Sequence, residues 1–581
     1  MNRRRLSRGF VGGLLVGSAP GLLLAAWAVP QNPWFLDLPF VYLFWMVLLP
    51  AVLLGLLARR IWPRPAGRER LLLLAPAQVA LLAFLWPKPA LDTPKLLVFG
   101  IDGATFDIID PMIAAGELPN IARVQREGAR GVLRSMDPIF SPLVWTTMAS
   151  GHTPDVHGVK GFHVHATDCK VPRFWDIAAA KGLRVGTYKW LATWPPRPVP
   201  GFIVPAWLAP TPETFPSELS FVKELELQSR LKRKNVPGRR STAALLTAGV
   251  PGGMRFSTLL ESAAWKLRER LSHPDEDERN LALQRLRGHI DRDVFIHALH
   301  AYYPDLATFT WYGTDGLGHR FWAAQQPEAF PEVDAAWKVR YAEAVRDSYR
   351  WADEILGQVL DRVGPDTTVM IVSDHGFRAF DKDRDIPAVT PTTEALRARL
   401  MPQFPGVQVA RLGIKVTVTV EPNQLDALDA ALRTLTDASG APFYRWEIVP
   451  DIAGTLGLTV MNEHPRPEEL AAGTVGGQPM TDFVHPGEAE AGEHDYEGIF
   501  LARGAGVPAG AKLPELQLID VTPTLLALLG IPPAQDLPGR IALGPQTRGP
   551  ASFNDLLPDY GAAGRSGEVN EDALRALGYI E

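Results

Sequence analysis

The sequence predicts an α/β fold in which helices cover both faces of a doubly wound, mostly parallel sheet. Two observations lead to this prediction. Short apolar runs recur along the chain, and runs this apolar are typical of strands that are buried on both faces of a parallel sheet. Helical patterns lie between these runs, and an alternation of strands and helices is typical of a doubly wound sheet.

The first strand is expected at Lys95–Asp102, where an apolar run ends in a carboxylate. Similar runs predict further strands at Leu183–Tyr188, Leu306–Trp311, Thr368–Ser373 and Gly498–Ala502. Helical patterns between them are found at Pro119–Gly128, Phe330–Val363 and Asp520–Leu529. We therefore expect one domain over residues 94–581, built on this sheet.

Two stretches break the alternation and predict insertions that cap the sheet, near residues 213–300 and 381–470. The first is charged and helical. The second has a strand pattern at Lys415–Glu421 and an amphipathic helix near Leu425–Leu435. The first also contains a basic cluster, for which we expect a solvated face, with contact to anionic lipid or substrate as the alternative. This cluster consists of Arg230, Lys232, Arg233, Lys234, Arg239 and Arg240.

Residues 1–90 are predicted to be a membrane anchor that precedes the α/β domain. Three apolar runs, at residues 9–29, 34–57 and 71–86, follow one another there. About 20 apolar residues cross a bilayer core, so the first two runs are long enough and the third is short. The alternative for the first run is a cleaved signal peptide, because Ala26-Trp27-Ala28 is similar to a cleavage site.

The arginines predict how this anchor is oriented, because positively charged loops stay in the cytoplasm. Four arginines lie at positions 3–8 and five lie at positions 59–70, whereas the loop at residues 30–33 has no charge. With three transmembrane helices, the chain after about Pro89 then lies on the outer side of the cell membrane, in the periplasm or outside the cell.

Charge and cysteine content exclude several classes of protein. The chain of 581 residues has a net charge of −5 and one cysteine, Cys169. A nucleic-acid binder that relies on bulk positive charge is excluded, and we expect no nucleic-acid partner. A disulfide scaffold and a cysteine-rich zinc module are excluded as well.

Carboxylates and imidazoles lie where the predicted strands end. Asp102 closes the first strand, Asp315 follows the strand at 306–311, and Asp374 and His375 close the strand at 368–373. His494 precedes the strand at 498–502. Ligands of open α/β sheets bind beyond the carboxyl ends of the strands, so these side chains can converge on one edge.

The residue types at this edge suit a divalent metal ion. His319 follows Asp315 by four residues, and one helical turn brings such a pair together. Carboxylate oxygens and imidazole nitrogens are ligands of Zn²⁺, and of Mn²⁺ as the alternative. Several carboxylates at one edge would lose hydration at a high cost unless cations compensate them.

The segment Ser141–Gly151 has two interpretations. In the structural one, Ser141 is a helix N-cap, Pro142 is the first helical residue and Gly151 ends the helix. The functional one keeps this geometry, because a helix N-terminus favours an anion. A metal nearby would lower the pKa of the serine hydroxyl and make it a nucleophile.

Taken in order, these segments resemble the alkaline phosphatase superfamily, most closely its type I phosphodiesterase/nucleotide pyrophosphatase branch. Ser141 lies ten residues before Gly151, which is the family's spacing between nucleophile and glycine. Residues 154–158 are similar to its Pro-x-x-His-Gly turn, and residues 373–376 to its second Asp-His ligand pair. The resemblance covers residues 96–162, 306–322, 368–377 and 492–540.

The resemblance implies an alkaline-phosphatase-like fold with two divalent metal ions. One would be held by Asp102, Asp374 and His375, and the other by Asp315, His319 and His494. Ser141 would bridge them as the nucleophile. His157 lies in a turn of the family without being one of its ligands, so we expect it to be structural.

The sequence also differs from the family pattern. Nucleotide pyrophosphatases carry threonine where this chain has Ser141, and an asparagine where it has Phe162. These differences argue against a nucleotide diester as the substrate. Without that asparagine, the phosphate oxygens would be bound by the metals, by backbone N–H groups or by Lys189. Pro142 follows the serine without a later arginine, which argues against a sulfatase.

We therefore expect a membrane-anchored, two-metal phosphoester hydrolase that acts through a covalent phosphoserine. One alternative is a transferase of the phosphoethanolamine or phosphoglycerol type that modifies a lipid or glycan. The other is a catalytically inactive membrane receptor or scaffold. The expected partners are the lipid bilayer and a phosphoester, for which a lipid or glycan linkage is one option.

Overall fold

A computed structural model describes residues 94–161, 164–230, 240–381, 389–412, 415–448, 453–462, 465–486 and 491–560. The predicted anchor at residues 1–90 lies outside these ranges, so the anchor and its orientation stay predictions. Among the helices that are described, none is long and apolar enough to cross a membrane.

The central sheet is mostly parallel, as predicted. β1 (Leu96–Ile101) pairs in parallel with β5 (Leu306–Trp311) and with β6 (Thr368–Val372). β3 (Val185–Tyr188) pairs in parallel with β5 and with β4 (Gly201–Val204). The strand order is β18-β2-β17-β6-β1-β5-β3-β4, and β19 also pairs with β2.

One strand of the sheet departs from the parallel arrangement. β17 (Glu497–Arg503) runs antiparallel to both β6 and β2 (Ala129–Arg134). The apolar pattern of this segment predicts a buried strand but carries no information about its direction. β2, β4 and the short strands β18 (Ala511–Lys512) and β19 (Leu516–Gln517) were not predicted.

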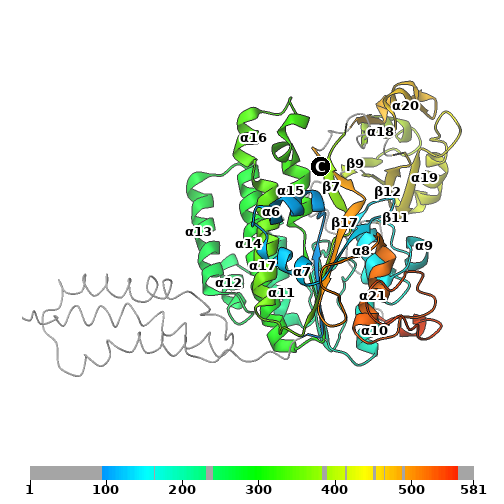
Figure 1. The fold of residues 1–581 in the computed structure, drawn as a ribbon. Helices are drawn as coiled ribbons and strands as arrows, with labels where there is room; N and C mark the ends of the chain where they lie inside the picture. Colours follow the sequence, from blue (N-terminus) through cyan, green and yellow to red (C-terminus); the bar gives the residue numbers. More distant parts are fainter. Residues whose placement is uncertain are drawn as a thin grey trace, which may run out of the picture.

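Helices cover both faces of the sheet, as the alternation predicted (Figure 1). Successive residues of β1 show this division, since Leu97 and Phe99 belong to one core cluster and Leu96 and Val98 to another. The first core includes residues from α6 (Phe106–Ala114), α7 (Pro119–Glu127), α14 (Glu276–Tyr302), α15 (Gly313–Gln325) and α17 (Ala344–Leu360). The second includes residues from α8 (Ser141–Ser150), α10 (Phe174–Ala180) and α21 (Val521–Leu528).

The first inserted stretch is helical and packs onto the sheet. It forms α11 (Ser220–Arg230), α12 (Thr242–Gly249), α13 (Phe256–Ser272) and the long α14. Phe221, Leu245 and Trp265 from these helices belong to the same core cluster as Phe99 of β1. The expected helical stretch at Phe330–Val363 is divided, because α16 (Ala335–Tyr341) ends before α17 begins.

The second inserted stretch has a sheet and a core of its own. β9 (Gln408–Leu412), β10 (Lys415–Thr419), β11 (Tyr444–Ile448) and β12 (Thr455–Val460) form an antiparallel sheet in the order β11-β12-β10-β9. Their core cluster runs from Val389 to Val484 and includes residues of α18 (Glu394–Leu400), α19 (Leu425–Leu432) and α20 (Pro467–Ala472). This unit is inserted between β7 (Gly376–Ala379) and β16 (Gly492–Asp495).

Candidate metal centre

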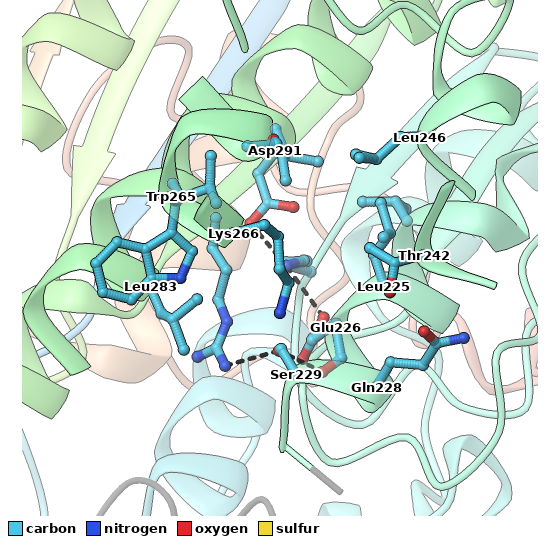
Figure 2. Close-up of a pocket in the computed structure, with 16 residues that line it drawn as sticks. Leu225, Glu226, Gln228, Ser229, Thr242, Leu246, Trp265, Lys266, Leu283 and Asp291 are labelled. Atoms are coloured by element: carbon cyan, nitrogen blue, oxygen red, sulfur yellow. Dashed lines mark hydrogen bonds and ion pairs between the residues drawn. The ribbon is translucent and has the colours of Figure 1, made fainter. Parts of the chain in front are cut away.

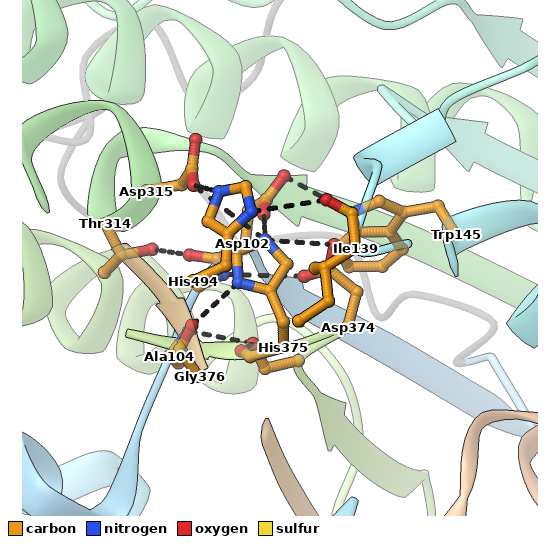
Figure 3. A network of polar contacts seen from close by, with 12 residues as sticks. Asp102, Ala104, Ile139, Trp145, Thr314, Asp315, Asp374, His375, Gly376 and His494 are labelled. Carbon is orange, nitrogen blue, oxygen red and sulfur yellow. Dashed lines mark hydrogen bonds and ion pairs between the residues drawn. The ribbon is translucent and has the colours of Figure 1, made fainter. Parts of the chain in front are cut away.

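Six carboxylate and imidazole side chains meet at the carboxyl edge of β1, β5 and β6, and five of them are labelled in Figure 3. Asp102 follows β1 directly, and Asp374 and His375 follow β6. Asp315 and His319 lie on α15, which begins after β5. His494 lies within β16, an unpredicted strand that pairs with β7 and places His494 opposite Phe377.

Asp102, Asp374 and His375 form one group of potential ligands. The Nε2 atom of His375 lies 3.2 Å from Oδ1 of Asp102 and 3.5 Å from Oδ2 of Asp374. All three residues are buried, and one ligand atom from each lies within 4.8 Å of the other two. These are the residues that the family resemblance assigns to one metal.

A second group is formed by Asp315, His375 and His494, again with ligand atoms within 4.8 Å of one another. Oδ1 of Asp315 lies 3.2 Å from Nε2 of His494 and 3.9 Å from Nε2 of His375. His319 lies beside this group, with its Nε2 3.3 Å from Oδ1 of Asp315 and 2.9 Å from Nε2 of His494. His375 is thus common to both groups, and the assignment of His319 as a ligand stays a prediction.

Neighbouring groups orient these side chains. Nδ1 of His375 lies 2.8 Å from the carbonyl oxygen of Gly376, and Nδ1 of His494 lies 3.3 Å from that of Ile139. In both residues Nε2 is therefore the nitrogen that faces the carboxylates, which is how metal-binding histidines are commonly held. The indole of Trp145 donates a hydrogen bond of 3.3 Å to Oδ2 of Asp102.

The buried atoms at the centre of the cluster fit a cation. Oδ1 of Asp102, Oδ2 of Asp374 and Nε2 of His375 are buried and make no hydrogen bond within the described part of the chain. Buried polar atoms of this kind are costly unless they are paired. Two carboxylate oxygens and an imidazole nitrogen that face one another are a suitable donor set for Zn²⁺ or a similar divalent ion.

The charges in the cluster are unbalanced. Burial, together with the charge of Asp315, raises the pKa of Asp102. Burial and the charge of Asp102 hold the pKa of Asp374 well above its usual range. Burial lowers the pKa of His375, but the charge of Asp374 and the contact with Asp102 outweigh this effect and raise it to about 10. The cluster therefore attracts positive charge.

Ser141 is the first residue of α8 and not its N-cap, so that prediction was wrong by one residue. Phe140 has an extended backbone, with φ −111° and ψ 120°, and its carbonyl oxygen accepts hydrogen bonds from the amides of Leu143 and Val144. These are the properties of an N-cap, so the serine hydroxyl does not have this role. Gly151 ends the helix with φ 70°, as predicted.

The chain contacts the cluster on both sides of Ser141. Ile139 precedes Ser141 by two residues and its carbonyl oxygen faces His494, whereas Trp145 follows by one helical turn and donates to Asp102. Ser141 itself is fully buried. Sequence reasoning missed Trp145 and Ile139, and the only available signal was their closeness to Ser141 in the chain. The role of Ser141 as nucleophile stays a prediction.

Of the two substrate-binding candidates, one is paired with carboxylates and the other cannot be placed, so both stay predictions. Nζ of Lys189 lies 2.6 Å from Oδ2 of Asp291 and 3.1 Å from Oε2 of Glu226, so its charge is compensated by the first insertion. Phe162 lies outside the described residues. His157 behaves as a structural residue, because its Nε2 lies 3.0 Å from Oγ1 of Thr147 and its Nδ1 accepts from the amide of Val159.

The fold and this cluster define a class of α/β protein that can hold metal ions at the carboxyl edge of its sheet. Residues 96–446 match the family model described as Type I phosphodiesterase / nucleotide pyrophosphatase. Because this match spans more than half of the chain, the protein belongs to that family, which confirms the resemblance seen in the motifs and indicates a phosphoester hydrolase. The match ends before His494. A comparison with curated proteins found no match.

Proposed function

We propose that this protein is a metal-dependent phosphoester hydrolase that uses two divalent cations and a covalent phosphoserine at Ser141. Membership of the phosphodiesterase family supports the reaction class. The observation that carries the proposal is the set of buried atoms of Asp102, Asp374 and His375 that make no hydrogen bond within the described residues and face one another beside β1. A site of this composition is expected to bind cations before it binds an anionic ester.

The six residues of the cluster would hold the cations. Asp102, Asp374 and His375 would surround one, and Asp315, His494 and either His319 or His375 would surround the other. When bound, such cations supply electrostatic stabilisation to the phosphoryl group and to the hydroxyl that attacks it. Trp145 and the carbonyl oxygens of Gly376 and Ile139 would keep the ligands in place.

The proposed reaction has two steps at the Ser141 hydroxyl. In the first, Oγ attacks phosphorus, the Oγ–P bond forms, and the ester P–O bond breaks to release the alcohol, which takes up the proton that the serine lost. In the second, water attacks the same phosphorus and cleaves the Oγ–P bond. This step restores the serine and releases the phosphate product.

Metal content and hydrolysis measured together test the proposal. The purified full chain should contain about two divalent cations and should hydrolyse p-nitrophenyl phosphate or bis(p-nitrophenyl) phosphate until a chelator is added. Asp374→Asn and Asp315→Asn should each lose metal and activity. The matched control is Asp305→Asn, because Asp305 precedes β5 and pairs with Lys95 at the opposite edge of the sheet. Unchanged metal content in the first two variants would refute the assignment.

A further inference from the structure

A pocket lies between the helices of the first insertion, and none of the six candidate metal ligands lines it (Figure 2). Its volume of about 140 Å³ compares with the engineered apolar cavity of about 150 Å³ that admits benzene. Apolar side chains form part of its wall, and polar or charged residues form the rest. The apolar part is formed by Val222 and Leu225 of α11, Leu246 of α12, Trp265 of α13, and Leu283, Leu286 and Ile290 of α14.

One wall of the pocket has an unused hydrogen-bond donor. Trp265 is 7% exposed, and its Nε1 atom is buried without a hydrogen-bond partner in the part of the chain that the structure describes. The nitrogen edge of its ring is turned toward the middle of the pocket (Figure 2). Buried indole N–H groups usually find an acceptor. An oxygen atom of a molecule in this pocket would satisfy the donor.

The charged groups at the polar end of the pocket compensate one another. Lys189 pairs with Asp291 at 2.6 Å and with Glu226 at 3.1 Å, and Lys223 also pairs with Glu226 at 3.1 Å. Two ammonium groups thus face two carboxylates. Elsewhere in the lining, Arg287 donates to Ser229 and Lys266 pairs with Glu269. The ammonium groups of the lining are therefore already paired with carboxylates, which favours a neutral ligand.

We propose that this pocket binds a small neutral molecule, or the end of a larger one, with about six carbon atoms and one hydrogen-bond acceptor. Its apolar part packs against the leucines of α11, α12 and α14. Its acceptor, such as the oxygen of an alcohol, accepts a hydrogen bond from Nε1 of Trp265. This site is separate from the metal centre, and the proposal does not depend on phosphoester hydrolysis.

Ligand-observed NMR titration of the full chain with cyclohexanol tests the proposal. The titration is done in the presence of chelator, so that failure of the hydrolase proposal does not affect the result. Saturable binding is expected, and replacing the hydroxyl by a carboxylate or an ammonium group should weaken it by at least about tenfold, because burying an uncompensated charge is costly. The absence of saturable binding, or equal binding of the charged analogues, would overturn the proposal.

Three variants locate the site. Leu246→Trp fills the pocket and should abolish binding, and Leu246→Phe is a milder version if the first does not fold. Trp265→Phe keeps the ring without the donor and should weaken binding by about fivefold, the usual value of one hydrogen bond. The control is Leu267→Trp, since Leu267 lies on the same helix as Trp265 but is 60% exposed. Wild-type affinity in Leu246→Trp would place the ligand elsewhere and refute the proposal.

Discussion

Two buried clusters of charged side chains lie at the carboxyl edge of the sheet, and they differ in how their charges are balanced. In the cluster around Lys189, each carboxylate has an ammonium nitrogen within 3.1 Å. In the cluster around His375, three carboxylates face imidazoles instead of ammonium groups, and the ion pairs of Asp102 and Asp374 among the described residues are with His375 alone.

The difference shows which cluster needs an additional cation. Buried carboxylates alone do not indicate a metal site, because a lysine can compensate them, as Lys189 does for Asp291. Only an excess of buried negative charge requires a cation from outside the chain. By this criterion the cluster around His375 is the candidate metal centre, and the cluster around Lys189 needs no additional cation.

The largest expected effect is on activity, and it tests which cluster is the reactive one. Ser141→Ala should lower turnover by at least about a thousandfold, because no covalent intermediate can form. Folding should be nearly unchanged, since Ser141 is not the N-cap of α8. Phosphoester hydrolysis and thermal unfolding of the same preparation measure both effects. Full activity in this variant would refute the covalent mechanism.

The next largest effect is on stability, and it compares the two clusters directly. Asp291→Asn leaves Lys189 without its nearest carboxylate and should lower the free energy of unfolding by about 3 kcal/mol. Asp374→Asn removes one of several repelling carboxylates, so the metal-free protein should unfold no more easily than the wild type. Denaturant unfolding in chelator gives both values.

A double variant is the control for this comparison. Adding Lys189→Met to Asp291→Asn removes the ammonium group that was left behind, and stability should partly return. If Asp374→Asn and Asp291→Asn destabilise the metal-free protein equally, the distinction between the clusters fails.

The sequence predicted the positions of the ligands better than their grouping. Asp102, Asp374 and His375 could be placed because each follows an apolar run, and the carboxyl ends of neighbouring strands meet at one edge. The pattern could not show that His375 lies between two groups of carboxylates, since this depends on side-chain orientation. The pattern also could not show that Lys189 belongs to a different cluster, since Lys189 follows a buried strand just as Asp102 does.

Other parts of the fold could not be predicted from the sequence for similar reasons. The antiparallel direction of β17 depends on the path of the chain around the sheet, which apolar runs do not record. The independent core of the second insertion depends on pairing between segments far apart in the chain, such as β8 (Val389–Pro391) and β15 (Val484–Pro486). The predicted N-cap of α8 was wrong by one residue, because the N-cap is Phe140, whose side chain cannot cap a helix.

His157 lies outside both clusters, and its pKa can be compared with that of His375. Burial lowers the pKa of His157 to about 4, whereas His375 among its carboxylates reaches about 10. Because the folded pKa of His157 is depressed, the unfolded chain takes up the proton first as the pH falls. Stability is therefore lost between pH 6.5 and 4, by up to about 3 kcal/mol from this residue.

The variant His157→Gln isolates this contribution, since glutamine does not titrate. Denaturant unfolding between pH 4 and 7 should show a weaker loss of stability at low pH than in the wild type. His297, whose pKa burial also lowers to about 4, remains in both proteins and contributes equally to each. Parallel pH profiles of the two proteins would contradict the assignment of His157 as a buried neutral imidazole.

The smallest expected effect concerns Trp145, which connects the nucleophile segment to the carboxylate-rich cluster. Its indole donates to Oδ2 of Asp102, and its ring lies so close to β1 that a Cβ atom on Gly100 would come within 2.6 Å of it. Trp145→Phe removes the donor and should weaken metal binding by about tenfold, the lower end of the range for a hydrogen bond to a charged group, because this bond is long at 3.3 Å. The matched control is Trp175→Phe, because Trp175 packs edge-on against Trp190 as Trp145 does, and is equally buried. Both variants lose part of an indole from the same aromatic core, so both should lower stability to a similar extent. Only Trp145→Phe should change the metal affinity measured by titration, and equal affinities in the two variants would show that the hydrogen bond to Asp102 does not position this ligand.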